Sequence, residues 1–254
     1  MNLELQGRVA LVTGGSRGIG RATAEALAKE GARVAISYLK NREKAEAIVG
    51  EIVASGGEMF AVNLDLGSIA SIRSAVESVA QKWGKLDILV NNAVEWGPVA
   101  GPASGLFEHL TPEEWQYPMR TNAEGTFATI QLAVPMMRRQ KWGRIVNVSA
   151  VLAEDGLAGY GWYSMAKASL HGLTRTLSKE LGPAGILVNC VMPGLTLTDR
   201  VQTMRAGSRT LVARSTPIRR MLQPCDVANP IVYLCSGANE SITGEVLRVS
   251  GGRM

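Results

Sequence analysis

The chain is poor in cysteine and histidine and has no long apolar run. Its cysteines, Cys190, Cys225 and Cys235, are odd in number and lack metal-ligand spacing, and His109 and His171 have no catalytic or metal-binding partners at suitable spacing. We therefore expect buried, reduced thiols and no metal site.

No apolar stretch approaches the ~20 residues of a membrane helix, and the first residues lack the charged and apolar regions of a signal peptide. These absences predict a cytoplasmic protein that does not enter a membrane.

Charge of one sign is concentrated in one segment only. The net charge of +5 is mild, but residues 199–222 contain a single acid, Asp199, and six arginines: Arg200, Arg205, Arg209, Arg214, Arg219 and Arg220. Such a segment either attracts a phosphorylated carrier or a coenzyme A-linked substrate, or is solvated charge on a loop. Because no aromatic residues interleave with the arginines, no nucleic-acid partner is expected.

Glycine is concentrated near the amino terminus, in the pattern of a dinucleotide site. The apolar run 9–12 leads into the glycine-rich residues 13–20, and an Ala-rich periodic stretch, 21–29, follows. A buried strand, a tight turn and a helix start in this order let the backbone approach a pyrophosphate, which faces free N–H groups of the helix. A glycine-rich turn alone is a weak signal, but this context favours nucleotide binding.

Short apolar runs alternate with helical patterns along residues 1–254, which predicts a single α/β domain. The pattern is typical of a Rossmann-type, doubly wound parallel sheet of about seven strands with helices on both faces. The predicted strands are 9–12, 33–38, 58–63, 87–90, 144–149, 187–191 and 246–249. The predicted helices are 18–30, 42–54, 69–83, 112–138, 161–181 and 225–234. Two long connections, 94–111 and 194–222, are expected to flank the substrate, because loops of this length are usually functional.

The second predicted strand indicates which coenzyme binds. NAD-binding sheets usually carry a carboxylate about 20 residues beyond the glycine turn, but here the strand ends at Ser37 and Tyr38, and residues 36–40 contain no acid. Arg17 lies in the turn, and Asn41 and Arg42 follow the strand. A missing carboxylate removes repulsion for a 2′-phosphate, and arginine binds phosphate well, so the sequence favours NADP(H).

Tyr163 and Lys167 form the candidate catalytic pair. A spacing of four residues places the phenol and the ammonium on the same helix face, one turn apart. A fixed neighbouring cation favours the phenolate and tunes a tyrosine for proton transfer. The pair is weak by itself and gains weight from the glycine-rich turn.

Together these motifs resemble the short-chain dehydrogenase/reductase family, most closely its NADPH-dependent 3-oxoacyl-carrier-protein and polyketide ketoreductases. The resemblance covers residues 7–252 and implies a Tyr163 general acid and base, a Lys167 that binds the nicotinamide ribose, and an Asn122 that holds a relay water. It also implies the coenzyme-binding residues, which are Gly14, Ser16, Arg17, Gly18, Ile19, Gly20, Ser37, Asn41, Arg42, Asp65, Leu66, Asn92, Ala93, Tyr163, Lys167, Pro193, Gly194, Thr196 and Thr198.

The chain departs from the family pattern at the catalytic serine. That serine usually lies thirteen residues before the tyrosine, where this chain has Ala150. Three interpretations are open: a bulge turns Ser149 into the site, another group replaces the donor, or catalysis is lost. Val94 also stands in place of the usual glycine after the Asn-Asn-Ala motif, and Ser250 in place of an aspartate.

The sequence thus predicts reduction of a small-molecule or carrier-linked ketone to a secondary alcohol. Two alternatives remain, a coenzyme-binding protein without turnover and an enoyl-type reductase. Tyr160 lies seven residues before Lys167, a spacing reminiscent of enoyl reductases, although we interpret it as a residue of the pocket wall. The resemblance implies a homotetramer, or a homodimer, built through the helices 112–138 and 161–181.

Overall fold

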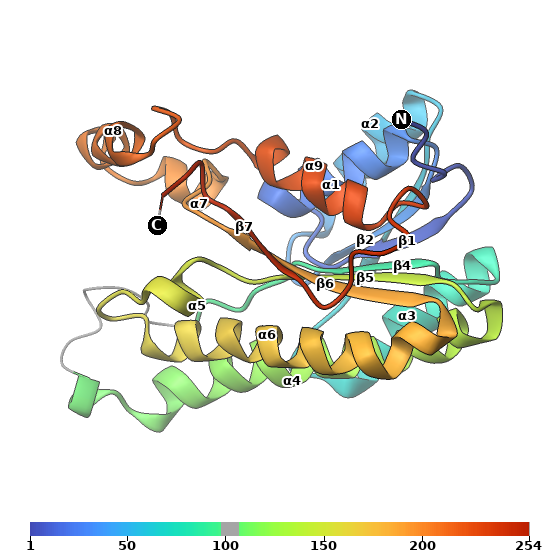
Figure 1. The fold of residues 1–254 in the computed structure, drawn as a ribbon, viewed down its shortest axis with the longest axis horizontal. Coiled ribbons are helices and arrows are strands. Elements are labelled where there is room, and N and C mark those ends of the chain that lie inside the picture. Colours follow the sequence, from blue (N-terminus) through green and yellow to red (C-terminus); the bar gives the residue numbers. More distant parts are fainter. Residues whose placement is uncertain (98–106, 254) are drawn as a thin grey trace.

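The computed structural model describes residues 1–97 and 107–253, and these form one seven-stranded parallel sheet with helices on both faces (Figure 1). The spatial order is β3-β2-β1-β4-β5-β6-β7. The strands are β1 (Val9–Val12), β2 (Arg33–Tyr38), β3 (Glu58–Asn63), β4 (Ile88–Asn91), β5 (Gly143–Val148), β6 (Ile186–Pro193) and β7 (Val246–Val249). The predicted Rossmann-type sheet is confirmed.

The main helices divide between the two faces of the sheet. On one face lie α1 (Gly18–Lys29), α2 (Arg42–Ala54) and α9 (Pro224–Leu234). On the other lie α3 (Ile69–Trp83), α4 (Pro112–Gln140) and α6 (Gly161–Leu181). The shorter helices are η2 (Phe107–His109), α5 (Leu152–Asp155), η3 (Gly182–Ala184), α7 (Asp199–Gln202) and α8 (Ala206–Ser215).

The side-chain alternation of β1 explains the two layers. Ala10 and Val12 pack in the cluster that contains α1, α2 and α9, whereas Val9 and Leu11 pack in the cluster of the opposite face. Successive strand residues point to opposite faces, and a strand covered on both faces is therefore apolar throughout. All four residues of β1 are fully buried.

The position of β1 determines where ligands can bind. It pairs with β2 on one side and with β4 on the other, so the connections after β1 and β4 lead away in opposite directions. Open α/β sheets bind ligands at such a switch point, beyond the carboxyl ends of the strands.

The predicted elements agree with the structure except at several boundaries. The strand predicted for 144–149 is Gly143–Val148, and the strand predicted for 187–191 runs over Ile186–Pro193. The connection 194–222 contains α7 and α8, and we call it the arm because it extends beside the sheet edge in Figure 1. The predicted loop 94–111 lies partly outside the described residues. No helix in the described part of the chain is long and apolar enough to cross a membrane.

Candidate active site

The glycine-rich turn after β1 is shaped for close approach by a ligand. Gly14 has φ of +64°, which favours glycine. A Cβ on Gly20 would lie 2.4 Å from the carbonyl oxygen of Gly14 and 2.5 Å from Asn92 Nδ2, so the first turn of α1 packs tightly against the glycine turn. Arg17 is the N-cap of α1, and neither a side-chain cap nor an acid in the first turn is seen in the described structure. The end of α1 can therefore receive an anion.

Polar side chains join the turn to the neighbouring strands. The N–H of Gly14 donates to Ser37 Oγ at 3.0 Å, which places Ser37 under the turn. Thr13 Oγ1 accepts from the N–H groups of Asn92 and Ala93, and Asn92 Nδ2 donates to the carbonyl oxygens of Thr13 and Gly14. Ser16 and Ile19 lie within the same turn and helix start.

The end of β2 carries no carboxylate. Asn41 caps α2 by accepting from the Lys44 N–H at 3.1 Å, and Arg42 pairs with Glu46 on the outside of the same helix. Arg17 is exposed. Lys44 forms an ion pair with Asp199, the first residue of α7, at 2.6 Å, which connects the arm to α2.

Two further segments are predicted to contact the coenzyme. One lies against the glycine turn, and the other lies against α4. A Cβ on Gly18 would lie 3.0 Å from Thr198 Cγ2, so the start of the arm is against the glycine turn. Thr196 Oγ1 donates to the Gly194 carbonyl oxygen at 3.0 Å, directly after Pro193 at the end of β6. Beyond β3, Asp65 accepts from the Gly67 N–H, and Leu66 packs against Gly125 of α4.

Tyr163 on α6 lies in an aromatic cluster and is 7% exposed. Its ring stacks on Trp96 with ring centroids 4.9 Å apart and an interplanar angle of 14°. Trp162 and Tyr160 make edge contacts with it at 5.7 Å and 6.3 Å. Burial raises the pKa of the phenol above its usual value, and the nearby Arg200 cation opposes the rise. Burial of the ring thus opposes the acidified phenol that the sequence predicts.

Lys167 is buried directly behind this cluster. Its Nζ donates to the carbonyl oxygen of Val148 at 2.8 Å and lies 5.9 Å from the centroid of the Tyr163 ring. Burial lowers the pKa of Lys167 to about 8. The ammonium therefore lies at the carboxyl end of β5, one turn of α6 from the phenol, as the spacing predicts.

Asn122 of α4 fixes the segment that follows β4. Its Nδ2 donates to the carbonyl oxygens of Glu95 and Pro118 at 2.7 Å and 2.6 Å, and its Oδ1 accepts from the Glu95 N–H at 3.1 Å. The side chain thus holds the residue next to Trp96.

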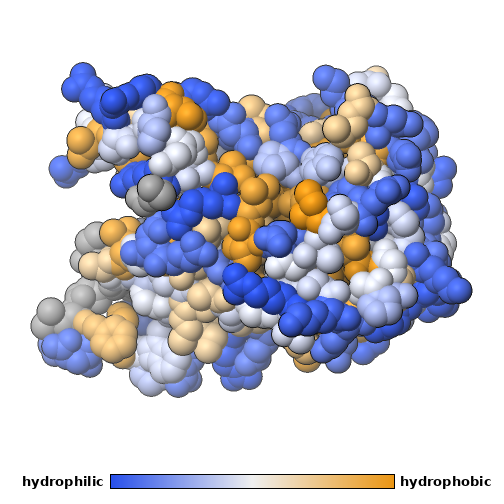
Figure 2. Space-filling view, viewed as in Figure 1, coloured by the Kyte–Doolittle hydropathy of each residue, from blue (hydrophilic) through white to orange (hydrophobic). Residues whose placement is uncertain are grey.

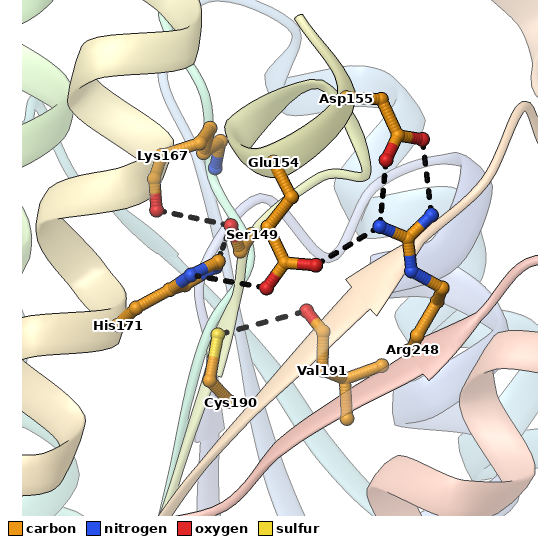
Figure 3. Close-up of polar contacts among 8 residues, drawn as sticks. All are labelled: Ser149, Glu154, Asp155, Lys167, His171, Cys190, Val191 and Arg248. Carbon is orange, nitrogen blue, oxygen red and sulfur yellow. Dashed lines mark hydrogen bonds and ion pairs between the residues drawn. The ribbon is translucent and has the colours of Figure 1, made fainter. Parts of the chain in front are cut away.

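Ser149 does not face the aromatic cluster. Figure 3 shows its hydroxyl directed at α6, where it donates to the Lys167 carbonyl oxygen at 3.0 Å and lies 2.9 Å from His171 Nε2. The ladder between β5 and β6 continues regularly to Val148 and Val191, and the Ser149 N–H donates to the Val191 carbonyl oxygen. This regular pairing leaves no bulge, so the structure disagrees with the interpretation that a bulge turns Ser149 into the site.

Ala150, and not Ser149, lies beside Tyr163. It packs in one cluster with Trp162 and Tyr163, against Val94 and Trp96. Beside the Tyr163 phenol, position 150 therefore offers a methyl group and no side-chain hydrogen-bond donor. Ser250, the other unusual residue, donates to the Arg253 carbonyl oxygen and packs against Gly194.

Two features of the site were missed by the sequence analysis. The first is a polar network in which Glu154 of α5 lies between His171, 3.8 Å away, and Arg248 of β7, 2.9 Å away (Figure 3). Neither histidine was expected to have such partners, because they are remote in sequence. The second is Arg200, whose guanidinium carbon lies 4.1 Å from the centroid of the Trp96 ring. The concentration of arginines in the arm was the available signal.

In the space-filling view, the surface is hollowed between the arm and the region of α5 (Figure 2). No cluster of three or more His, Cys, Asp or Glu residues suited to a metal ion is found in the described residues.

Comparisons with known proteins agree with this arrangement. The family model described as "Enoyl-(Acyl carrier protein) reductase" matches residues 14–253. A 3-oxoacyl-[acyl-carrier-protein] reductase of Aquifex aeolicus (strain VF5) is 39% identical, covering 99% of both chains. The enzyme of the same name from Staphylococcus aureus (strain Mu50) is 37% identical, covering 96% of both.

A solved structure, a 7α-hydroxysteroid dehydrogenase complexed with NADH and 7-oxo glycochenodeoxycholic acid, superimposes with a TM-score of 0.92. It is 33% identical, and the match covers 100% of this chain and 96% of that one. A dehydrogenase/reductase from Sinorhizobium meliloti 1021 gives a TM-score of 0.88 at 35% identity, covering 99% and 97%.

The sheet, the glycine turn and the Tyr–Lys helix thus define a nicotinamide-dependent oxidoreductase. The chain belongs to the short-chain dehydrogenase/reductase family. Within that family it is similar to the 3-oxoacyl-[acyl-carrier-protein] reductases.

Proposed function

We propose that the protein is an NADPH-dependent ketoreductase that converts a ketone into a secondary alcohol. The observation that carries the proposal is the convergence on α6 of groups from two strand ends. Tyr163 packs against Val94 and Trp96 after β4 and Ala150 after β5, and Lys167 bonds to the last residue of β5. A phenol and an ammonium at the carboxyl edge of a dinucleotide-binding sheet are suited to proton transfer to a carbonyl oxygen.

The residues of the glycine turn fit NADP(H). The turn is too tight for side chains at Gly14 and Gly20, and the start of α1 is free of acids. Arg17, Asn41 and Arg42 surround a strand end without a carboxylate, which suits a 2′-phosphate. We assign the adenine side to Asp65 and Leu66 and the nicotinamide side to the segments ending at Ala93 and Thr198. When bound, the coenzyme supplies the hydride.

The chain's own groups provide the proton. Tyr163 Oη donates to the carbonyl oxygen, and the Lys167 ammonium favours the phenolate that remains. Asn122, held between the segment after β4 and the body of α4, holds the relay water from which the proton is replaced.

The relatives suggest a 3-oxoacyl substrate linked to an acyl carrier protein. The aromatic cluster around Tyr163 and the arginines of the arm are consistent with a mid-sized apolar ketone, free or attached to an anionic carrier. We also propose a cytoplasmic homotetramer or homodimer. Phe127 on α4 and Met165 on α6 are 52% and 47% exposed, and apolar side chains at such positions favour contact with a second copy.

One observation favours a second candidate, reduction of an activated carbon–carbon double bond. The family model that matches the chain is described as an enoyl reductase, and Tyr160 lies 6.3 Å, between ring centroids, from Tyr163. In that reaction Tyr160 replaces Tyr163 as the proton donor.

The test follows NADPH oxidation with a panel of ketones and enones, in the wild type and in matched phenol-to-phenyl variants. Tyr163→Phe is expected to lower ketone turnover by about 10²-fold or more, because it removes the proton donor, while Tyr160→Phe leaves it within a few-fold. NADPH binding, measured by fluorescence titration, shows that each variant is folded.

Retention of most ketone turnover in Tyr163→Phe would reject Tyr163 as the donor. Loss of enone reduction in Tyr160→Phe alone would support the enoyl reductase. If NADPH binds and no member of the panel oxidises it, the protein is a coenzyme-binding member of the family without turnover.

A further inference from the structure

One face of the Tyr163 ring is covered by the indole ring of Trp96. The two rings are nearly parallel and in contact, and edge contacts from Trp162 and Tyr160 close other sides of the phenol. Tyr163 is left 7% exposed. Access to this face of Tyr163 therefore requires the indole ring to move.

Trp96 is held from two elements at once. Tyr163 of α6 stacks on its ring, and Arg200 of α7 lies over the same ring at 4.1 Å. The Asn122 side chain fixes Glu95, the preceding residue, through hydrogen bonds to both its N–H and its carbonyl oxygen. The backbone next to Trp96 is thus anchored, while its side chain rests on contacts that a ligand can exchange.

The surroundings of this stack are aromatic to an unusual degree. Three of the five tryptophans of the chain, Trp96, Trp115 and Trp162, belong to the cluster around Tyr163. Aromatic pairs and cation–π pairs depend on flat faces. A flat ring that enters between Tyr163 and Trp96 keeps a stacking partner for both of them, whereas an alkyl chain separates the pair and offers no equivalent contact.

We propose that Trp96, held by Arg200, is a specificity-determining gate that selects ketones with a flat ring adjoining the carbonyl over linear aliphatic ketones. The inference rests on the proposed ketoreductase function, and it departs from the linear 3-oxoacyl substrate that the relatives suggest. It also gives Arg200 a defined role, since its guanidinium lies over the indole ring and holds it against Tyr163.

The test compares acetophenone with 2-octanone, two ketones with equal numbers of carbon atoms. Because exchange of one aromatic stacking contact changes affinity by about tenfold, the wild type is expected to prefer acetophenone in kcat/KM by about tenfold. The preference should disappear in Trp96→Ala and persist in Trp96→Phe. Arg200→Gln should weaken it, whereas the matched control Arg205→Gln, at an exposed position in the same arm, should leave it unchanged.

A second measurement separates this inference from the proposed function. Titration calorimetry of both ketones into the protein saturated with NADP⁺ measures binding without turnover. The tighter binding of acetophenone is expected to persist in Trp96→Phe, to weaken in Arg200→Gln and to disappear in Trp96→Ala. An acetophenone preference in binding without any reduction would leave the gate in place and reject the ketoreductase. Reduction of both ketones with equal kcat/KM, unchanged in Trp96→Ala, would overturn the gate and leave the ketoreductase standing.

Discussion

Ala150 places a methyl group beside Tyr163, where the ketoreductases that this chain resembles have a hydroxyl group. A donor directed at developing negative charge contributes roughly 10²–10³ in rate. The only hydroxyl on the neighbouring residue, that of Ser149, is engaged by the Lys167 carbonyl oxygen and lies against His171. Among the described residues, the surroundings of the proposed proton donor Tyr163 thus include neither the Ser149 hydroxyl nor a hydroxyl at position 150.

We predict that Ala150→Ser raises kcat for ketone reduction by about tenfold or more, because it adds a donor next to the phenol. The added oxygen is small, and Ala150 borders the cluster at which the substrate is expected. Steady-state kinetics with NADPH provide the measurement. Ser149→Ala is the matched control and should leave kcat unchanged, since that hydroxyl points to α6. An unchanged rate in Ala150→Ser would mean that another group already supplies the donor.

At this scale the sequence predicted how Tyr163 and Lys167 lie relative to each other better than it predicted which side chains cover Tyr163. The spacing of Tyr163 and Lys167 places them one turn apart, because helix geometry is local. The stack of Trp96 on Tyr163 and the contact of Arg200 join three segments distant in sequence, so no local pattern contains them. The alternation of strand residues did indicate that Ser149 and Ala150 face opposite ways.

Among the elements, the four-residue helix α5 is held by side-chain contacts to two others. It begins two residues after Ala150 and is too short to be stable alone. Arg248 of β7 binds both Glu154 and Asp155, and Glu154 also faces His171 of α6. These contacts attach α5 to the sheet and to the helix that carries Tyr163 (Figure 3).

This network predicts a pH dependence of stability. Burial lowers the pKa of His171 below its ordinary 6.5; Glu154 opposes the shift and Arg175 adds to it. The unfolded chain then binds more protons than the folded one just below pH 6.5, so unfolding free energy is lost as pH falls from 6.5 towards the folded-state pKa. His171→Gln should flatten this slope, by at most about 1.4 kcal/mol per pH unit.

Urea denaturation between pH 5 and 8 measures the effect. The other histidine of the chain, His109, is exposed on η2, and His109→Gln is the matched control that should reproduce the wild-type slope. A wild-type slope retained in His171→Gln would show that other groups dominate acid unfolding.

Elements with strong periodicity were predictable, and those shaped by tertiary contacts were not. The strands β1, β2, β3 and β7 have the predicted bounds, because apolar runs between turn residues mark them clearly. The helices α5, α7 and α8 lie in segments predicted as connections. Helices α7 and α8 contain no buried residues, so no apolar periodicity in the sequence indicates them.

For the whole molecule, the sheet order brings the proposed coenzyme and substrate residues to one edge. The turn after β1, the segment after β4 and the arm after β6 meet there through Asn92, Gly18 and Thr198. The Lys44–Asp199 pair adds a link between the arm and α2. Binding of a coenzyme across these segments should therefore stabilise the fold as a unit.

We predict that NADPH stabilises the protein more than NADH does. A ligand at a hundred times its Kd adds about 2.7 kcal/mol, which for a chain of this size corresponds to a Tm increase of roughly 5–10 °C. NADH at the same concentration should give a clearly smaller increase, because it lacks the 2′-phosphate that we assign to Arg17 and Arg42. Differential scanning fluorimetry with each coenzyme measures the difference.

Arg17→Gln should reduce the difference between the two coenzymes, since it removes a cation from the glycine turn while leaving the backbone N–H groups in place. Arg33→Gln is the matched control: this exposed arginine pairs with Glu58 at the amino ends of β2 and β3, remote from the ligand edge of the sheet. This variant should lower the Tm of the free protein only slightly, because exposed ion pairs contribute about 0–1 kcal/mol to stability. The difference in Tm increase between NADPH and NADH should stay as in the wild type. Equal stabilisation by NADPH and NADH in the wild type would contradict the proposed 2′-phosphate site, since the missing carboxylate at the end of β2 would then have no consequence for coenzyme selection.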